Sequence, residues 1–169
     1  MNNETQSLEI VAEKPQELMR RATDVQFAWA AGFIDGEGCL GIFNERDKRK
    51  GNSYTHFRPS IQVSNSNLES LKSMKRILFN HGTVMPLGKR RPRHKPVHQY
   101  SIRRQIHIVE ILFALLPYFV TKRVQAEHLL AFCISRQNSS GKGRYHKFTA
   151  NEKLIFQVIK HENKRGSND

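Results

Sequence analysis

The clearest alternation of apolar and polar positions in the chain lies between Tyr54 and Asn65. Every second residue from Phe57 to Val63 is apolar, and the residues between them are polar. This period of two predicts a strand with one buried face and one open face. Shorter runs predict three more strands, over residues 39–45, 83–87 and 97–104.

Apolar residues at helical spacing precede, separate and follow these strands. The starts of helices are marked by an S/T-x-x-E/Q pattern, whose two side chains satisfy free N–H groups of the first turn. The pattern pairs Thr23 with Gln26, Ser66 with Glu69 and Thr149 with Glu152. Helices are predicted to begin at these three places, and the second is predicted to end at Gly82. Two further helices are predicted over residues 106–116, stopped by Pro117, and over residues 121–137.

The predicted order is therefore helix, two strands, helix, two strands and then helices, or αββαββα. This order predicts an α+β fold, in which a four-stranded antiparallel sheet carries helices on one face and leaves the other face open. Residues 23–162 are expected to form one domain, with residues 1–22 as an N-terminal extension and residues 163–169 as a C-terminal tail.

Composition and charge add a partner to this picture. The 169 residues carry a formal net charge of +13, a balance typical of proteins that bind a polyanion. Basic residues cluster in three predicted loops: Arg46, Lys48 and Arg49; Lys89, Arg90, Arg91 and Arg93; and Lys142 and Arg144. The open face of the sheet would add Arg58, Gln62, Gln99, Ser101 and Arg103. Because such side chains contact phosphates and read base edges, we expect double-stranded DNA to lie against this face.

The cellular location is predicted from what the sequence lacks. Cys39 and Cys133 have no C-x-x-C partner, which suits a reducing compartment. We see no apolar leader, and we expect the protein to act in the cytoplasm with the nucleoid, or in an organelle that encodes it. No membrane association is expected, because the apolar run before Asp35 has about 10 residues and a spanning helix needs about 20.

The helix that starts at Thr23 has small residues on one face. Ala28, Ala31, Gly32 and Asp35 lie there, and a second backbone could approach them closely. A glycine inside a helix costs about 1 kcal/mol relative to alanine, which close helix contact would offset. We therefore expect these four residues to form a dimer interface.

Two acids stand at the C-terminal end of this helix, where the helix dipole favours cations. Asp35 and Glu37 are separated by Gly36 and followed by Gly38, so a positive group is expected nearby. One interpretation is a D-G turn that leads into the next strand. The other is a metal site, because two packed copies of the helix would bring two Glu37 carboxylates together, and a divalent cation would relieve their repulsion.

Residues 30–38, AAGFIDGEG, resemble the nine-residue signature of the LAGLIDADG homing endonucleases. The matching positions are Gly32, Asp35, Gly36 and Gly38, whereas Ala30 replaces the first leucine and Glu37 the second aspartate. The chain has one copy of the signature. Members with one copy are homodimers, so the resemblance implies signature helices packed at a dimer axis and saddle-shaped sheets that straddle DNA.

The resemblance also implies a catalytic site. Glu37 would bind Mg²⁺ or Mn²⁺, with the Gly36 carbonyl as a further ligand and Ca²⁺ as a non-catalytic substitute. Lys122 falls on the active-site lysine of the family, and Asp35 would hold the turn in place. Asn65 falls on a polar residue near the attacking water, but a turn residue before the next helix is an equal interpretation of Asn65.

The expected activity is that of an intron-encoded homing endonuclease, which makes metal-dependent double-strand cuts at a long pseudo-palindromic site as a homodimer. Two alternatives stay open. The same fold could bind DNA or RNA without cutting, as an intron maturase or a transcription regulator. A basic ribosomal or RNA-binding protein would explain the charge but not the D-G-E-G pattern.

Overall fold

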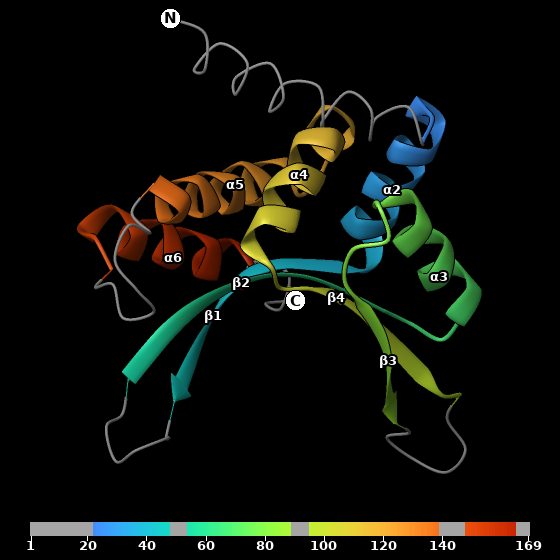
Figure 1. The fold of residues 1–169 in the computed structure, drawn as a ribbon, viewed down its shortest axis with the longest axis horizontal. Coiled ribbons are helices and arrows are strands. Elements are labelled where there is room, and N and C mark those ends of the chain that lie inside the picture. Colours follow the sequence, from blue (N-terminus) through green and yellow to red (C-terminus); the bar gives the residue numbers. More distant parts are fainter. Residues whose placement is uncertain (1–21, 48–53, 89–94, 139–147, 165–169) are drawn as a thin grey trace, which may run out of the picture.

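A computed structural model describes residues 22–47, 54–88, 95–138 and 148–164. Its elements follow the expected αββαββα order and continue into further helices (Figure 1). They are α2 (Asp24–Glu37), β1 (Gly38–Asp47), β2 (Tyr54–Asn65), α3 (Leu68–Ile77), β3 (Thr83–Gly88), β4 (Val97–Ile102), α4 (Gln105–Leu115), the 3-10 helix η2 (Leu116–Tyr118), α5 (Arg123–Asn138) and α6 (Ala150–Glu162). Residues 1–21 of the expected extension lie outside the described residues.

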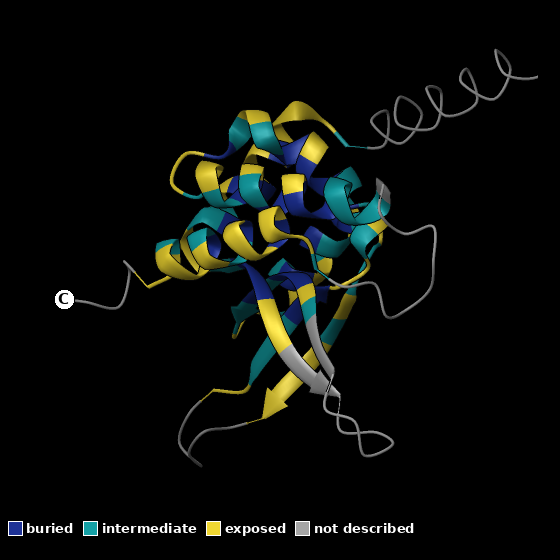
Figure 2. Ribbon diagram, turned by 90° about the vertical axis from the view of Figure 1, so that its left-hand side faces the viewer, coloured by how far each residue is buried: buried dark blue, intermediate teal, exposed yellow. Residues whose placement is uncertain are grey.

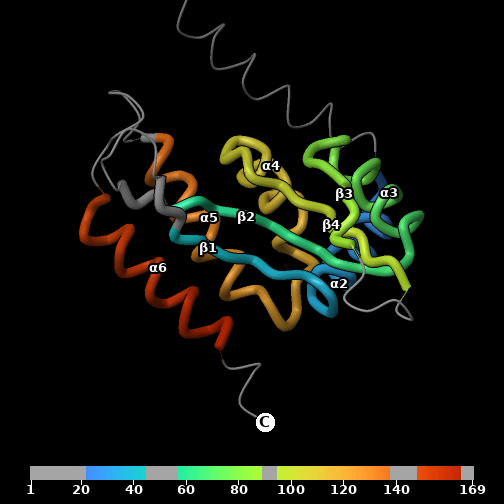
Figure 3. Tube along the Cα trace, turned by 90° about the horizontal axis from the view of Figure 1, so that it is seen from below, coloured from blue at the N-terminus to red at the C-terminus, as the bar shows by residue number. Residues whose placement is uncertain are grey.

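One antiparallel sheet, with the strand order β1-β2-β4-β3, forms the centre of the domain. It bends into an arch, and the hairpins β1–β2 and β3–β4 point away from the helices on its two sides (Figure 1). Seen from below, the concave face of the arch is not crossed by any described helix (Figure 3). The expected α+β fold, with helices on one face of a four-stranded sheet, is therefore confirmed.

Strand register decides which side chains face the helices. Val63 pairs with Gly38 on β1 and with Tyr100 on β4, so these three positions share the helix side of the sheet. The side chains of Leu40, Ile61, Val63, Tyr100 and Ile102 are fully buried on that side. Buried residues concentrate between the helices and the sheet, whereas residues 43–44 of β1 and 85–88 of β3 are exposed (Figure 2).

The helix α2 begins as predicted but ends differently. Gln26 N–H donates to Thr23 Oγ1 at 3.3 Å, and Thr23 N–H donates to Gln26 Oε1 at 2.9 Å, which confirms the capping box. The helix then continues through Asp35 and Gly36 to Glu37, and β1 begins at Gly38. Gly38 has an extended φ of −92°, so no left-handed glycine turn separates the two elements. A Cβ on Gly38 would lie 2.6 Å from Ile34 O, and this close approach explains the glycine.

The helix α3 corrects two sequence predictions. Its N-cap is Asn67, whose Oδ1 accepts from Ser70 N–H at 3.1 Å, so the predicted Ser66 cap is wrong. The helix ends at Ile77, well before the predicted Gly82. Ser66 and Asn67 can both act as an N-cap, and the sequence pattern S-N-x-E does not show which of them accepts the hydrogen bond from the first turn.

The C-terminal helices agree more closely with the sequence. Pro117 lies in η2 and stops α4, and α5 begins at Arg123. The cap of α6 is confirmed, because Glu152 N–H donates to Thr149 Oγ1 at 3.1 Å and Thr149 N–H donates to Glu152 Oε2 at 2.8 Å. Within the described residues, every helix is too short or too polar to cross a membrane.

Candidate nucleic-acid interface and metal site

The C-terminal end of α2 is bonded to the chain just before α5. The Asp35 carboxylate accepts from the backbone N–H groups of Val120 at 2.8 Å, Thr121 at 3.2 Å and Lys122 at 2.9 Å. Asp35 accepts a further bond at its backbone, because Lys122 Nζ donates to the Asp35 carbonyl oxygen. These bonds give Asp35 a structural role within the chain.

Two helix ends meet at this point, and their dipoles explain the arrangement. The C-terminus of α2 is negative and receives the Lys122 ammonium, whereas the positive N-terminus of α5 lies beside the Asp35 carboxylate. Burial alone would raise the pKa of Asp35. The backbone hydrogen bonds from residues 120–122 outweigh burial, so the pKa of Asp35 lies below its usual value. Lys122 is the positive group expected at this helix end.

Glu37 and Gly36 are both exposed at the end of α2. The Gly36 carbonyl is one of the last four of the helix, which have no partner inside the helix. Carboxylate and carbonyl oxygens are the ligands that Mg²⁺ prefers, so these two residues fit a hard divalent cation. No group of three or more His, Cys, Asp or Glu side chains in the described residues could hold a metal. Among the described residues, Glu37 is therefore the exposed carboxylate that this end of α2 offers to a cation.

Asn65 ends β2 and performs a turn function. Its Oδ1 accepts from Asn67 N–H at 2.8 Å, which shapes the approach to α3. Because Gly38 pairs with Val63, Asn65 lies at the same end of the sheet as Glu37. The structure thus shows the turn role for Asn65, at a position close in register to the exposed acid.

Polar side chains form a row across the concave face, and hydrogen bonds divide it into two groups. Gln62 Nε2 donates to Ser60 Oγ at 3.1 Å, and Gln99 Nε2 donates to Gln62 Oε1 at 3.3 Å. Arg103 Nε donates to Ser101 Oγ at 3.2 Å, and Ser101 is directly opposite Gln62 in the register of β2 and β4. The structure therefore brings four of the five predicted open-face residues into two neighbouring bonded groups.

The remaining basic residues of the predicted interface are less fully described. Arg58 is exposed on β2. Arg46 belongs to β1, where it pairs with Thr55 of β2. The other loop residues lie outside the described residues: Lys48, Arg49, Lys89, Arg90, Arg91, Arg93, Lys142 and Arg144.

One side of α2 is open in the single chain. Ala28, Gly32 and Gly36 are exposed, and a Cβ on either glycine would meet no described atom within 4 Å. Large apolar side chains are also exposed on α2 and beside its end: Val25 (77%), Trp29 (40%), Val120 (82%) and Val124 (49%). Ala31 is fully buried in the core of the chain itself, so the open stripe is narrower than the four residues predicted from the sequence.

Sequence reasoning did not single out His81, Arg104 and His107, which line a cavity beside the concave face. No ligand spacing connects these residues along the chain. The sequence feature that could have indicated this cavity is the basic pair of Arg103 and Arg104, which lies between a strand and an apolar helix.

The fold and the site together define a class of protein: an arched α+β domain with a polar concave face and an exposed carboxylate at the end of its first helix. A family model described as LAGLIDADG endonuclease matches residues 30–138. The chain belongs to the LAGLIDADG endonuclease family, which confirms the resemblance of its signature. A search of curated protein sequences found no match.

Solved structures share this fold. The chain is 22% identical to the homing endonuclease I-CvuI, solved in complex with the I-CreI target in the presence of 2 mM Mg with the DNA not cleaved; the match covers 81% of this chain and 96% of that chain, with a TM-score of 0.57. The archaeal intron-encoded homing endonuclease I-Vdi141I, complexed with DNA, is 14% identical over 83% and 98% of the two chains, with a TM-score of 0.56. The LAGLIDADG homing endonuclease I-SmaMI, bound to cleaved DNA, is 15% identical over 84% of this chain and 45% of that chain, with a TM-score of 0.60.

Proposed function

We propose that this chain is a site-specific homing endonuclease that cuts both strands of DNA as a homodimer, with divalent cations such as Mg²⁺ or Mn²⁺ held by Glu37 of each copy. The observation that carries the proposal is the exposed Glu37 carboxylate at the end of a helix whose small face is open. Two such helices in contact would place two carboxylates near one axis.

Each residue of the site has a defined task in this proposal. A bound divalent cation supplies a Lewis acid that lowers the pKa of a bound water and stabilises charge on a phosphate oxygen. Glu37 and the Gly36 carbonyl bind the cation. The Lys122 ammonium has three N–H donors, of which the Asp35 carbonyl uses one, so others can stabilise a phosphate oxygen. Asp35 acts as a positioning residue for Lys122.

The homodimer is supported by the surface of α2. The exposed stripe of Ala28, Gly32 and Gly36 has room for a second backbone, and Val25 and Trp29 lie at helical spacing on the same side. Exposed apolar residues of this size are typical of a protein surface that has a partner. A two-fold dimer would read a long pseudo-palindromic target.

DNA is the proposed partner of the concave face. The Gln62–Gln99 pair presents amide groups that suit adenine edges, and Arg103 suits guanine or phosphate. Related folds were solved with DNA, including I-CvuI in the presence of Mg or Ca. We also propose that the chain is intron-encoded and acts where its target DNA resides, by analogy with the intron-encoded I-Vdi141I.

The first experiment is incubation of the purified protein with a library of long DNA sites and Mg²⁺, with an EDTA control. Cutting of both strands at one pseudo-palindrome, abolished by EDTA, is the expected result. Binding without cutting, in a library that contains the bound site, would contradict the endonuclease and favour a maturase or regulator that uses the same face.

The second experiment separates chemistry from binding. Glu37→Gln keeps the size of the side chain but removes the charge, and it should bind DNA with a cleavage rate reduced by more than about 100-fold. Glu69→Gln is the matched control, because Glu69 is an exposed acid on α3 that pairs with Lys72. Normal cleavage by the Glu37→Gln protein would remove the catalytic assignment.

A further inference from the structure

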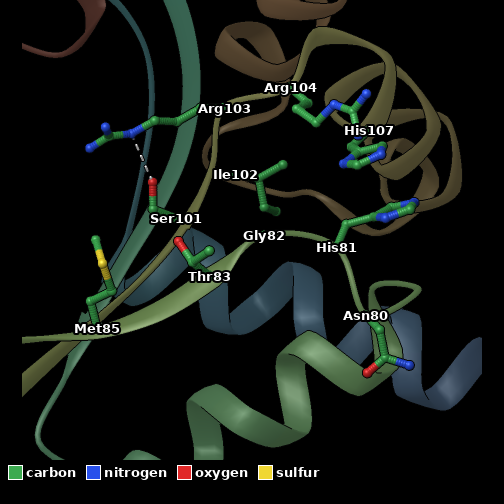
Figure 4. Close-up of a pocket in the computed structure, with 10 residues that line it drawn as sticks. All are labelled: Asn80, His81, Gly82, Thr83, Met85, Ser101, Ile102, Arg103, Arg104 and His107. Atoms are coloured by element: carbon green, nitrogen blue, oxygen red, sulfur yellow. Dashed lines mark hydrogen bonds between the residues drawn. The ribbon is translucent and has the colours of Figure 1, made fainter.

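A cavity of about 450 Å³ opens between the loop before β3, the end of β4 and the start of α4 (Figure 4). Four of its lining side chains are cationic or become cationic on protonation: His81, Arg103, Arg104 and His107. Thr83 and Ser101 add hydroxyl groups. This set of donors suits an anion that carries several oxygen atoms.

The two histidines are stacked, with ring centroids 3.6 Å apart and ring planes 5° from parallel. His81 Nε2 donates to Glu110 Oε2 at 2.7 Å, so one carboxylate lies beside the pair. Figure 4 shows Arg104 on the other side of His107 from His81. Arg104 and the two imidazole rings lie together with the Glu110 carboxylate beside them, so an added anion would be attracted to this column.

The N-terminus of α4 lies at the same cavity, because its N-cap residue Arg104 and its third residue His107 both line it. The Arg104 side chain makes no capping hydrogen bond, and the first turn of α4 contains no acid. Free N–H groups and the positive end of a helix dipole favour an anion at this position. The cavity therefore combines a helix terminus with cationic side chains.

The cavity is continuous with the polar row of the concave face. Ser101 and Arg103 belong to that row and also line the cavity. Nucleic acid that lies against Gln62 and Gln99 would bring its backbone towards the cavity, since Gln99 and Ser101 both lie on β4 and Ser101 pairs with Gln62 of β2.

We propose that this cavity binds a phosphate group of the DNA backbone, and that His107 takes up a proton when the phosphate enters. The proposal adds a ligand site to the proposed function and rests on it for the source of the phosphate. The phosphate would accept hydrogen bonds from Arg104 and His107 and would place a negative charge beside them.

The pKa of His107 sets the direction of the pH dependence. Burial, followed by the nearby His81 and Arg104, holds the pKa of His107 below its usual value, and Glu110 acts against this. Burial raises the pKa of Tyr100, whose hydroxyl donates to the His81 carbonyl, so Tyr100 stays neutral. A bound phosphate favours the imidazolium and raises the pKa of His107. The affinity of the protein for DNA should therefore rise as the pH falls. This gain is lost as the pH rises through the pKa of His107 in the complex.

Duplex binding should be measured by fluorescence anisotropy at about pH 6 and pH 8 over a range of salt concentrations. Each unit by which binding raises the pKa of His107 allows about a tenfold gain in affinity on acidification. His107→Gln should lose most of this gain. Arg104→Gln should reduce the slope of log affinity against log salt concentration by about 0.9, as expected for one lost phosphate contact. Lys160→Gln removes an exposed charge on α6 and should change neither quantity.

The histidine ring signals of the wild-type protein provide a test that needs no variant. Titration of His107 by NMR should show a higher pKa in the presence of a short duplex than in its absence. A rise with orthophosphate but not with the bound duplex would overturn the backbone assignment, and no rise with either ligand would overturn the site. Failure to bind any duplex would contradict the proposed function itself, and the orthophosphate titration would then decide on the cavity alone.

Discussion

Asp35 and Lys122 are joined by two hydrogen bonds, and Lys122 is the donor in both. Lys122 N–H donates to the Asp35 carboxylate at 2.9 Å, and Lys122 Nζ donates to the Asp35 carbonyl oxygen. The backbone of one residue thus meets the side chain of the other in both bonds. The position of the Lys122 ammonium is therefore determined by the end of α2, at a residue two positions before the exposed Glu37.

Asp35→Asn should lower the free energy of unfolding by about 1–2 kcal/mol at neutral pH. The substitution replaces a charged acceptor of three N–H groups with a neutral one, and the partial exposure of the site keeps the loss small. The pKa of Asp35 is lowered in the folded state. Its contribution is therefore present above the unfolded value of 3.8 and is lost as the pH falls through the folded value.

Urea unfolding at several pH values checks this prediction. The difference between wild type and Asp35→Asn should shrink below about pH 4. Glu127→Gln, which changes an exposed acid paired with Arg123, serves as the control and should show a small effect. An Asp35→Asn difference that stays constant down to strongly acidic pH would contradict the role given to the carboxylate.

Lys122→Met should reduce the single-turnover cleavage rate by about 100-fold, because it removes a charge placed to stabilise the phosphate. DNA affinity should fall much less, since the proposed interface contains many other basic residues. Lys153→Met, at an exposed position of α6, is the matched control and should cut at the normal rate. Equal rates for the two variants would exclude Lys122 from the reaction.

Gly32→Leu should abolish the proposed dimer while leaving the chain folded. A Cβ at this position meets no described atom within 4 Å in the single chain, so the leucine is expected to displace a second copy rather than the core of its own chain. Analytical ultracentrifugation should show a monomer, and circular dichroism should be unchanged. Ala150→Leu, at the exposed start of α6, should remain dimeric. A dimeric Gly32→Leu protein would show that this face of α2 is not the interface.

Alanine substitutions at two signature glycines should have opposite effects on folding. Gly38→Ala places a Cβ 2.6 Å from Ile34 O and 2.8 Å from Ile34 Cγ2, which should cost about 1–3 kcal/mol. The Cβ added by Gly32→Ala meets no described atom within 4 Å, so this substitution should raise the stability of the helix by up to about 1 kcal/mol. Thermal unfolding at a protein concentration that favours the monomer measures both, and equal shifts would contradict the close approach at Gly38.

Local patterns predicted much of the fold. The alternation from Phe57 to Val63 identified β2 and its buried face, since a period of two is a local property of the strand. The capping boxes at Thr23 and Thr149 also depend only on residues three apart. The cap at Ser66 failed for the same reason, because Asn67 offers an equally local alternative.

Long-range contacts limited what the sequence could predict about the site. The signature identified Glu37 and the family resemblance identified Lys122, but no spacing shows that Asp35 binds the backbone of residues 120–122. The stacked His81 and His107 come from a loop and a helix that approach each other only in the folded domain. Neither the Asp35 contacts nor the histidine stack corresponds to a spacing pattern in the sequence.

The separation of Asp35 from its donors has a consequence for how the protein folds. The N–H groups that satisfy its carboxylate come 85 to 87 residues later in the chain. During synthesis, α2 leaves the ribosome long before residues 120–122, and its acidic end has only water as a partner until they arrive. Closing so large a loop is a slow event in folding. The last turn of the signature helix is therefore expected to become ordered late, together with the docking of α5.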